Sequence, residues 1–420
     1  MILFVDITQK TFVMDTGERY CLLMDNLSGF PLFYPNLYIT TQVRNKSLSY
    51  SAMESTLNGI AIFLRFLAGR NENIEKRFHV GHFFQENELD ALRDYCQIKF
   101  RSRTTVDNLD GLFTLSESQE LDERVSSQTE YIRLTVIAHY IKWLAEQVVG
   151  INKDRFTVLQ IGKMEKGLKA RRPVKKKRNQ DSREKGLDKK QIDLLFELFR
   201  PSSEINPFKD EAIQSRNRLI FLMLYHLGLR GGELLNIRIR DIDFSKNQLV
   251  ISRRADEKDD PRKYQPLVKT LDRRLPLKET LVKEVHHYIL NERKSIPNSA
   301  KNDFLFIAHK SGPTQGQPLS KSGYKKIIAI VRDVSPSLFN LTGHQLRHTW
   351  NEIFSENMDS MDESPNHEQQ EKIRSYLMGW REGSGTAAVY NARFVKRKAN
   401  EVALKLQNSM IRLPKGMSND

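Results

Sequence analysis

A strongly basic stretch near the middle of the 420-residue sequence divides it into two parts. Residues 163–190 contain 13 basic and four acidic side chains, a net charge of +9 out of +15 for the whole chain. Large apolar residues are rare in this stretch, so it is not expected to build a hydrophobic core. We therefore predict a basic interdomain linker over residues 161–186, with folded domains on both sides.

The surplus positive charge indicates an anionic partner, either nucleic acid or an anionic membrane surface. The linker itself is either a solvated tether or a strap that lies along phosphates and releases counterions. We favour the strap, only because motifs later in the chain also carry donors suited to phosphate. The residues that it would place on phosphates are Arg171, Arg172, Lys175, Lys176, Lys177 and Arg178.

Composition excludes several classes of protein. Hydrophobic residues make up 39% of the chain, which is enough to build cores and argues against global disorder. The two cysteines, Cys21 and Cys96, provide neither a disulfide framework nor a CxxC metal site. The apolar run over 219–224 is too short to span a bilayer, and the N-terminus lacks a basic signal-peptide region. We expect a protein of a reducing cytosol, with no membrane contact.

The part before the linker is predicted to be mostly helical. Residues 1–45 are interpreted as a strand-rich segment with a hairpin turn at Asp15-Thr16-Gly17. Residues 46–160 are predicted to form a helical domain because apolar residues recur at helical spacing. The helices expected there cover 50–67, 86–98 and 130–149.

The part after the linker has a mixed pattern that predicts an α+β domain with a small sheet. The expected helices cover 187–199 and 211–229, with a short helix over 232–236. The expected strands are Leu249–Ile251, Leu267–Val268 and Arg273–Leu277. Helices are expected to dominate after Leu277.

Four clusters in this second part carry donors suited to phosphate. In the first, Arg230 lies between an apolar helix and a glycine-rich turn, and Glu233 can steady its guanidinium or cap the next helix. In the second, His344 and Arg347 share one face of a helix that Thr342 can cap. Each pattern taken alone is also common in sites that are purely structural.

The third cluster contains Trp380 and, after Gly383-Ser384-Gly385, a Thr386 that can cap a helix carrying Tyr390. A tryptophan offers an indole N–H donor, and the glycines would let a nucleophilic tyrosine move into place. The alternative is that both aromatics are core residues. The fourth cluster places Lys269 at a predicted hairpin tip, where a merely solubilising lysine is the alternative.

In order and local sequence, these clusters resemble the tyrosine recombinases, the phage integrase family, over residues 187–400. The matching positions are Arg230, Lys269, His344-Gln345-Leu346-Arg347, Trp380 and Tyr390. Three features depart from the usual pattern. A tryptophan occupies the third box, Lys263 competes with Lys269 for the lysine role, and the acidic stretch 356–371 lengthens the gap between the second and third boxes.

The resemblance implies a multidomain fold. A mainly α, SAM-like core-binding domain over 46–160 would precede an α+β catalytic domain over 187–420 with a small antiparallel sheet and a helical tail. The segment 1–45 would bind accessory arm sites or pack on the helical domain. The tail over 394–410 would dock on a neighbouring copy or pack within its own chain.

The resemblance also implies a mechanism. Tyr390 would attack the scissile phosphate and form a 3′-phosphotyrosyl link, while Arg230 and Arg347 hold the non-bridging oxygens. His344 and Trp380 would donate further hydrogen bonds, and Lys269 would protonate the leaving oxygen. Glu233 and His348 would support these groups. No metal and no cofactor are expected.

The expected partners are double-stranded DNA with specific sites and three further copies of the chain, so that a tetramer assembles on two sites from free monomers. Accessory directionality or bending proteins are also expected from the resemblance. The enzymatic alternative is a type IB topoisomerase, which relaxes DNA without pairing sites. The alternative from another class is a DNA-binding regulator with an idle site.

Overall fold

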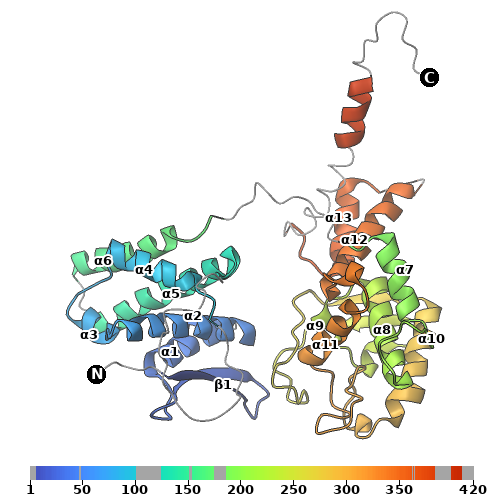
Figure 1. The fold of residues 1–420 in the computed structure, drawn as a ribbon, viewed down its shortest axis with the longest axis horizontal. Coiled ribbons are helices and arrows are strands. Elements are labelled where there is room, and N and C mark those ends of the chain that lie inside the picture. Colours follow the sequence, from blue (N-terminus) through green and yellow to red (C-terminus); the bar gives the residue numbers. More distant parts are fainter. Residues whose placement is uncertain are drawn as a thin grey trace, which may run out of the picture. The chain divides into compact units, whose positions relative to one another are not determined.

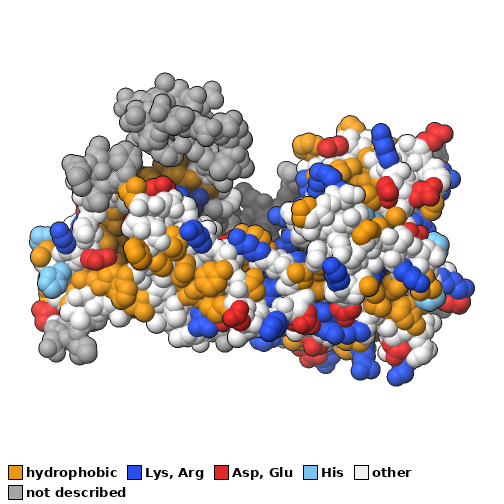
Figure 2. All heavy atoms as spheres, turned by 90° about the horizontal axis from the view of Figure 1, so that it is seen from below, with side chains coloured by type: hydrophobic (Ala, Val, Ile, Leu, Met, Phe, Trp, Pro, Cys, Tyr) orange, Lys and Arg blue, Asp and Glu red, His pale blue; other side chains and the backbone are white. Residues whose placement is uncertain are grey.

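The computed structural model describes residues 6–46, 49–100, 124–150, 154–174, 186–361, 363, 365–383 and 399–408. They fall into two compact units, whose main parts are Arg19–Asn179 and Gln180–Asp420 (Figure 1). In Figure 2, apolar side chains gather on the visible face of the first unit, whereas acidic and basic side chains are mixed over the second. No described helix is long and apolar enough to cross a membrane.

The first unit opens with a β-hairpin. Strand β1 (Ile7–Val13) pairs antiparallel with β2 (Arg19–Asp25), and Phe12 lies opposite Tyr20. The predicted turn at residues 15–17 is therefore confirmed. The inner positions of β2 are buried, and α2 (Tyr50–Gly69) packs against this strand.

The prediction of strands up to residue 45 is wrong beyond the hairpin. Helix α1 (Phe33–Tyr38) continues without a break through η1 (Ile39–Val43) and η2 (Arg44–Lys46). Ile39 and Val43 are one helical turn apart and both are buried in the core of the first unit. Burial of this apolar face outweighs the strand preference of the Thr and Val residues in the segment.

A helical bundle forms the rest of the first unit. Its core combines aliphatic and aromatic side chains, among them Leu57, Phe63, Ile137 and Tyr140. The helices that follow α2 are α3 (Ile74–His79), α4 (Glu86–Gln97), α5 (Ser127–Val149) and α6 (Arg155–Ala170). Helix α5 is central because it packs against α2, α3, α4 and α6. The helices predicted over 50–67, 86–98 and 130–149 are confirmed.

Helix α6 corrects the predicted start of the linker. Ile161, Met164 and Leu168 lie on one face of this helix and are buried in the core of the first unit. Lys163 and Lys166 between them are exposed, so the basic composition hid an amphipathic helix. The first unit therefore extends well past residue 160. Residues 175–185, which hold most of the remaining linker charge, lie outside the described residues.

The second unit is helical around one small sheet. The three strands pair antiparallel in chain order, β3 (Ile242–Asp243), β4 (Gln248–Ile251) and β5 (Arg273–Pro276). The strands predicted at 249–251 and 273–277 are confirmed. Leu267–Val268 is not a strand, because it belongs to the long connection between β4 and β5.

Helix α8 (Glu211–Leu227) is the centre of the second unit and packs against α9, α10, η4 and α12. The predicted helices over 187–199 and 211–229 are confirmed. The other helices are α7 (Lys189–Leu198), α9 (Gly231–Leu234), η3 (Ile239–Asp241), α10 (Glu279–His287), η4 (Tyr288–Arg293), η5 (Ser299–Lys301), α11 (Lys321–Arg332), η6 (Pro336–Leu338), α12 (Gly343–Ser360), α13 (His367–Met378) and a helix over 399–408.

The acidic stretch 356–371 is largely helical rather than an irregular insertion. It contributes the last turn of α12 and the first turn of α13, which Asn366 caps by accepting from the backbone N–H of Gln369. Side chains here are mostly exposed, with Gln370 buried. The stretch therefore lengthens two helices that support the second and third boxes.

Candidate active site

The turn between α8 and α9 places Arg230. Gly228 ends α8 with a left-handed φ of +59°, and a side chain at this position would press against Trp350 and Met378. Arg230 is the N-cap of α9, and its backbone N–H donates to a carboxylate oxygen of Glu233 at 3.0 Å. The side chain of Arg230 is 29% exposed, so it is partly accessible at the start of a helix.

Glu233 is a fully buried carboxylate with arginines on several sides. Arg273 of β5 contacts it at 3.0 Å, while Arg230 and Arg347 lie at 3.7 and 3.8 Å. The hydroxyl of Thr270 also donates to it. Burial raises the pKa of Glu233, but the charge and hydrogen bonds of Arg273, together with Arg347 and Thr270, outweigh burial and hold the pKa below its ordinary value.

Arg347 is the most enclosed arginine of the group, with 0% exposure. Its guanidinium donates to the carbonyls of Gly228 at 2.7 Å and Met378 at 2.9 Å, and lies 5.4 Å from the ring centre of Trp380. The sequence predicts a phosphate contact for this residue. In the structure it also joins the end of α8 to the end of α13.

Helix α12 presents His344 at the surface. Thr342 caps the helix by accepting from the backbone N–H of Gln345, which confirms the predicted cap. His344 is exposed, and its ring lies edge-on to that of His348 with 4.7 Å between ring centres. Since Arg347 is buried three residues on, the two residues face different surroundings on one helix.

Tyr324 of α11 fits between two glycine turns of this site. A Cβ built on Gly343 would lie 1.8 Å from the Tyr324 hydroxyl oxygen, and one on Gly231 would lie 2.9 Å from its ring. The ring therefore touches the starts of both α9 and α12. Burial raises the pKa of this phenol. No pattern in the sequence predicts this contact.

Lys269 lies beside the same cluster. It is exposed between buried Val268 and buried Thr270, and Thr270 donates to Glu233. The predicted hairpin tip is wrong, because Lys269 lies close to the start of β5 rather than at a tight turn between two strands. Its rival Lys263 is also exposed, and its ammonium nitrogen lies 5.7 Å from the ring centre of Tyr264.

Trp380 lies against Arg347 on the buried side of the cluster. It follows Gly379, which ends α13 with a left-handed φ of +64°. The indole is 7% exposed and packs with Met378 and Trp350. The backbone N–H of Leu271 donates to the Gly379 carbonyl at 2.9 Å, so the end of α13 is tied to the loop that carries Lys269.

Two sets of predicted residues are not placed at this site. Tyr390 and Lys175–Arg178 lie outside the described residues. Arg171 and Arg172 belong to the first unit, where Arg171 pairs with Glu86 at 2.7 Å and Asp90 at 2.6 Å. Arg172 lies 4.7 Å from the ring centre of Tyr131 and donates to Thr135.

The assembled groups are suited to an oxyanion. The partly exposed side chain of Arg230 and the buried Arg273 and Arg347 lie around a buried carboxylate, whose charge they exceed. His344 at the start of α12 and Lys269 in the loop before β5 add exposed nitrogen groups. Positively charged donors of this kind bind phosphate oxygens. Among the described residues, no group of three or more His, Cys, Asp or Glu side chains has a metal-binding arrangement.

Comparison with known proteins gives the family. The sequence profile of the phage integrase family matches residues 186–392, a range that contains all six predicted catalytic residues from Arg230 to Tyr390. Residues 186–392 form a domain of the phage integrase family. This is the tyrosine recombinase family, which the sequence motifs resemble.

Individual relatives match the integrase domain over shorter ranges. The tyrosine recombinase XerA of Pyrococcus horikoshii is 27% identical over 148 residues, 35% of this chain and 44% of that protein. Transposase A from transposon Tn554 of Staphylococcus aureus is 30% identical over 149 residues, 35% of this chain and 38% of that protein. The match thus spans less than half the length of these relatives.

A crystal structure of XerA recombinase aligns with 85% of this chain and 92% of its own, at 15% sequence identity and a TM-score of 0.33. A TM-score below 0.5 does not establish a shared arrangement. The family membership therefore rests on the integrase sequence match.

The structure of the integrase domain adds residues that the motifs missed. Arg273 and Thr270 hold Glu233, and Tyr324 separates two helix starts. Arg273 carries a recognisable signal, because it shares the inner face of β5 with buried Leu275 while Arg274 faces outward. A buried arginine on a strand requires a buried counter-charge.

Replacing Glu233 with Gln should lower the free energy of unfolding by about 3–5 kcal/mol at pH 7, because buried Arg273 and Arg347 lose their counter-charge. The lowered pKa of Glu233 means that its stabilisation is present above the unfolded pKa of about 4.3 and is lost as pH falls through the folded pKa. Urea denaturation of wild type and Glu233→Gln at several pH values measures both effects. Equal acid sensitivity of the two proteins would contradict the assignment.

Gly343→Ala should destabilise the protein by about 1–3 kcal/mol, because the new methyl group overlaps the Tyr324 hydroxyl. Adding Tyr324→Phe removes that oxygen, so the double variant should recover part of the loss in a urea titration. Gly162→Ala is the control, since its Cβ meets no atom within 4 Å. A double variant no more stable than Gly343→Ala would show that the overlap is not the cause.

Proposed function

We propose that this protein is a site-specific DNA recombinase, the integrase or transposase of a mobile element, which acts on double-stranded DNA in the bacterial cytoplasm. The observation that carries the proposal is the convergence of Arg230, Arg347, Trp380 and the Lys269 loop around buried Glu233, inside an integrase-family domain. The names of the relatives, a tyrosine recombinase and a transposase, support the same reaction class.

In the proposed reaction, the phenolic oxygen of Tyr390 attacks the scissile phosphorus. The new bond joins tyrosine to the 3′-phosphate as the bond from phosphorus to the 5′-oxygen breaks. His344 assists removal of the phenol proton, and Lys269 gives a proton to the departing 5′-oxygen. Attack by a 5′-hydroxyl of another strand reverses these steps, so the phosphodiester energy is conserved and no ATP is used.

The described geometry supports different tasks for the two motif arginines. Arg230 is partly exposed at a helix start, so it is the arginine that a phosphate oxygen reaches directly. Arg347 is buried and joins the ends of α8 and α13. It therefore adds positive charge from the protein interior and holds these two helix ends in place. The Trp380 indole forms the apolar wall beneath the phosphate.

Four copies on two DNA sites would carry out the strand exchange, as in the family's reaction. The helix over 399–408 carries exposed Val402 and Leu404, so it is our candidate for a contact between neighbouring copies. Accessory directionality or bending proteins would select the direction of recombination.

Wild-type protein should become covalently attached to DNA, and Tyr390→Phe should not. The substrate is a library of nicked suicide duplexes with random sequence, incubated in EDTA, and the adduct is the species that survives SDS. Sequencing of the captured DNA gives the site. A Tyr390→Phe protein that still forms the adduct would falsify the nucleophile assignment.

Two further observations separate the alternatives in this experiment. Arg230→Ala should bind the captured site but lose the adduct, because Arg273 and Arg347 still match the charge of buried Glu233. Relaxation of plasmid that lacks the captured site would instead indicate a type IB topoisomerase. DNA binding without any wild-type adduct would indicate an idle regulator and contradict the proposed enzyme.

Changing Lys175, Lys176, Lys177 and Arg178 to Gln should reduce the steepness of the plot of log K against log salt concentration for DNA binding by about 3 to 4. Four phosphate contacts are lost, so fewer counterions are released on binding. Arg171→Gln with Arg172→Gln is the matched control. Their side chains are held within the first unit, so this pair should lower thermal stability and leave the slope nearly unchanged. An unchanged slope for the first set makes the stretch a plain tether.

A further inference from the structure

The connection between β4 and β5 is long, irregular and yet well anchored. Residues 252–272 contain no helix or strand. A loop of this length is usually either functional or disordered. Here polar and charged side chains of the loop are nevertheless buried. They are Asp260, Arg262, Gln265 and Thr270, together with apolar Val268.

Arg262 is the main anchor of this connection. Its guanidinium forms a two-pronged contact with Asp260 at 2.7 and 2.9 Å. It also donates to the carbonyls of Leu235 at 2.9 Å and Leu319 at 3.0 Å, and to the side-chain oxygen of Asn236 at 2.9 Å. The arginine side chain is 6% exposed and the Asp260 side chain is 0% exposed. One loop residue thus joins the end of α9 to the segment before α11.

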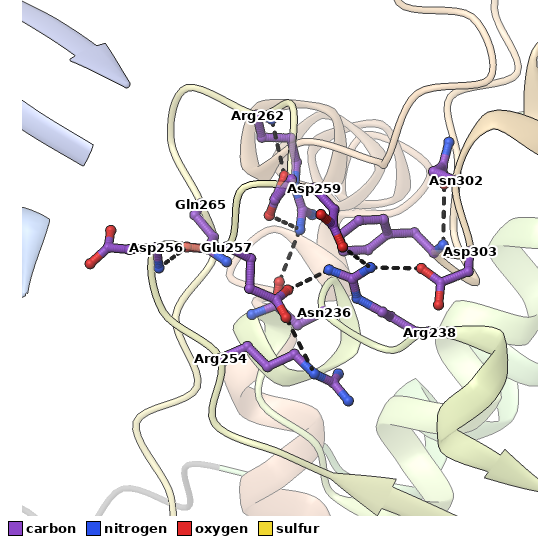
Figure 3. A network of polar contacts seen from close by, with 12 residues as sticks. Asn236, Arg238, Arg254, Asp256, Glu257, Asp259, Arg262, Gln265, Asn302 and Asp303 are labelled. Carbon is purple, nitrogen blue, oxygen red and sulfur yellow. Dashed lines mark hydrogen bonds and ion pairs between the residues drawn. The ribbon is translucent and has the colours of Figure 1, made fainter. Parts of the chain in front are cut away.

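A second anchor lies beside the first, as Figure 3 shows. Arg238 pairs with Glu257 of the connection and with Asp303 at 2.7 Å. The guanidinium groups of Arg238 and Arg262 lie 4.4 and 4.6 Å from the ring centre of Phe304. Both arginines therefore lie against one aromatic ring, while each pairs with a different carboxylate of the connection, Arg238 with Glu257 and Arg262 with Asp260.

These anchors continue to the residues on both sides of Lys269. The side-chain amide N–H of Asn236 donates to the backbone carbonyl of Pro266, three residues before the lysine. Thr270, one residue after it, donates to Glu233. Gly232 permits the closest approach, because a Cβ there would lie 2.7 Å from the Leu267 carbonyl oxygen. The backbone that carries Lys269 is therefore fixed against α9, the helix that Arg230 caps.

We infer that Arg262 and Asn236 are positioning residues that hold Lys269 beside the Arg230–Glu233 pair before DNA binds. The inference deepens the proposed function and rests on it. A held ammonium group loses less conformational freedom when it transfers its proton than one on an unanchored loop. Arg262 acts through the loop backbone and touches no reacting atom.

The proton transfer that depends on this positioning is specific. As the tyrosine–phosphorus bond forms and the bond to the 5′-oxygen breaks, the Lys269 ammonium gives one proton to that oxygen and becomes a neutral amine. With sulfur in place of the 5′-bridging oxygen, the leaving group is a thiolate. A thiol has a pKa of about 8.5, so it departs without a proton.

The test compares cleavage of the captured site with a bridging oxygen and with a bridging sulfur, using the full-length protein. Arg262→Met and Asn236→Ala should slow cleavage of the oxygen substrate about 10- to 100-fold, as expected for a misplaced catalytic group. On the sulfur substrate, both variants should cleave at a rate close to that of wild type. Lys269→Ala should show the same contrast, and Lys263→Ala should show neither effect.

Arg218→Met is the matched control, because Arg218 of α8 pairs with Glu284 of α10 at 2.9 Å, outside the connection that carries Lys269. It should affect both substrates equally. Equal losses on both substrates for Arg262→Met and Asn236→Ala would overturn the inference, as would unchanged cleavage of the oxygen substrate. If Arg262→Met does not fold, Asn236→Ala decides. Wild type that cleaves neither substrate would contradict the proposed function instead.

Discussion

The buried carboxylate of Glu233 is the constraint on which the site depends. An ion taken out of water costs several kcal/mol unless its charge is matched at close range. Arg273 and Arg347 supply that match from β5 and α12. Each arginine also donates to carbonyls near the end of α13, Arg273 to Leu377 and Arg347 to Met378. The electrostatic requirement of one side chain therefore fixes the relative positions of several elements.

This constraint explains why the motif residues are not equivalent. The sequence predicts two arginines that clamp one phosphate, yet Arg347 is enclosed and Arg230 is partly exposed. Spacing along a helix gives the face on which a residue lies, but not what covers that face. The cover over Arg347 comes from Gly228 and Met378, 119 and 31 residues away. Contacts at such separations cannot be inferred from a local pattern.

The sequence predicted the strongly periodic helices and the order of the site motifs, because both depend on short-range spacing. It failed where composition and pattern disagreed. The linker predicted over 161–186 begins inside helix α6, because the charge count favours a linker although Ile161, Met164 and Leu168 follow helical spacing. Residue preference alone predicts a strand at Leu267–Val268. In the structure, Asn236 satisfies the nearby Pro266 carbonyl, so a strand partner is not needed there.

The balance of charge in the cluster has a consequence for binding. Three arginines and one carboxylate leave a net charge of +2 on Arg230, Glu233, Arg273 and Arg347. Because Glu233 and two of the arginines are buried, water screens this charge poorly. An oxyanion that reaches the exposed edge of Arg230 would therefore meet the field of all four groups. This field would stabilise the phosphate most when the phosphate gains negative charge in the transition state. The field would therefore stabilise the transition state more than the bound substrate.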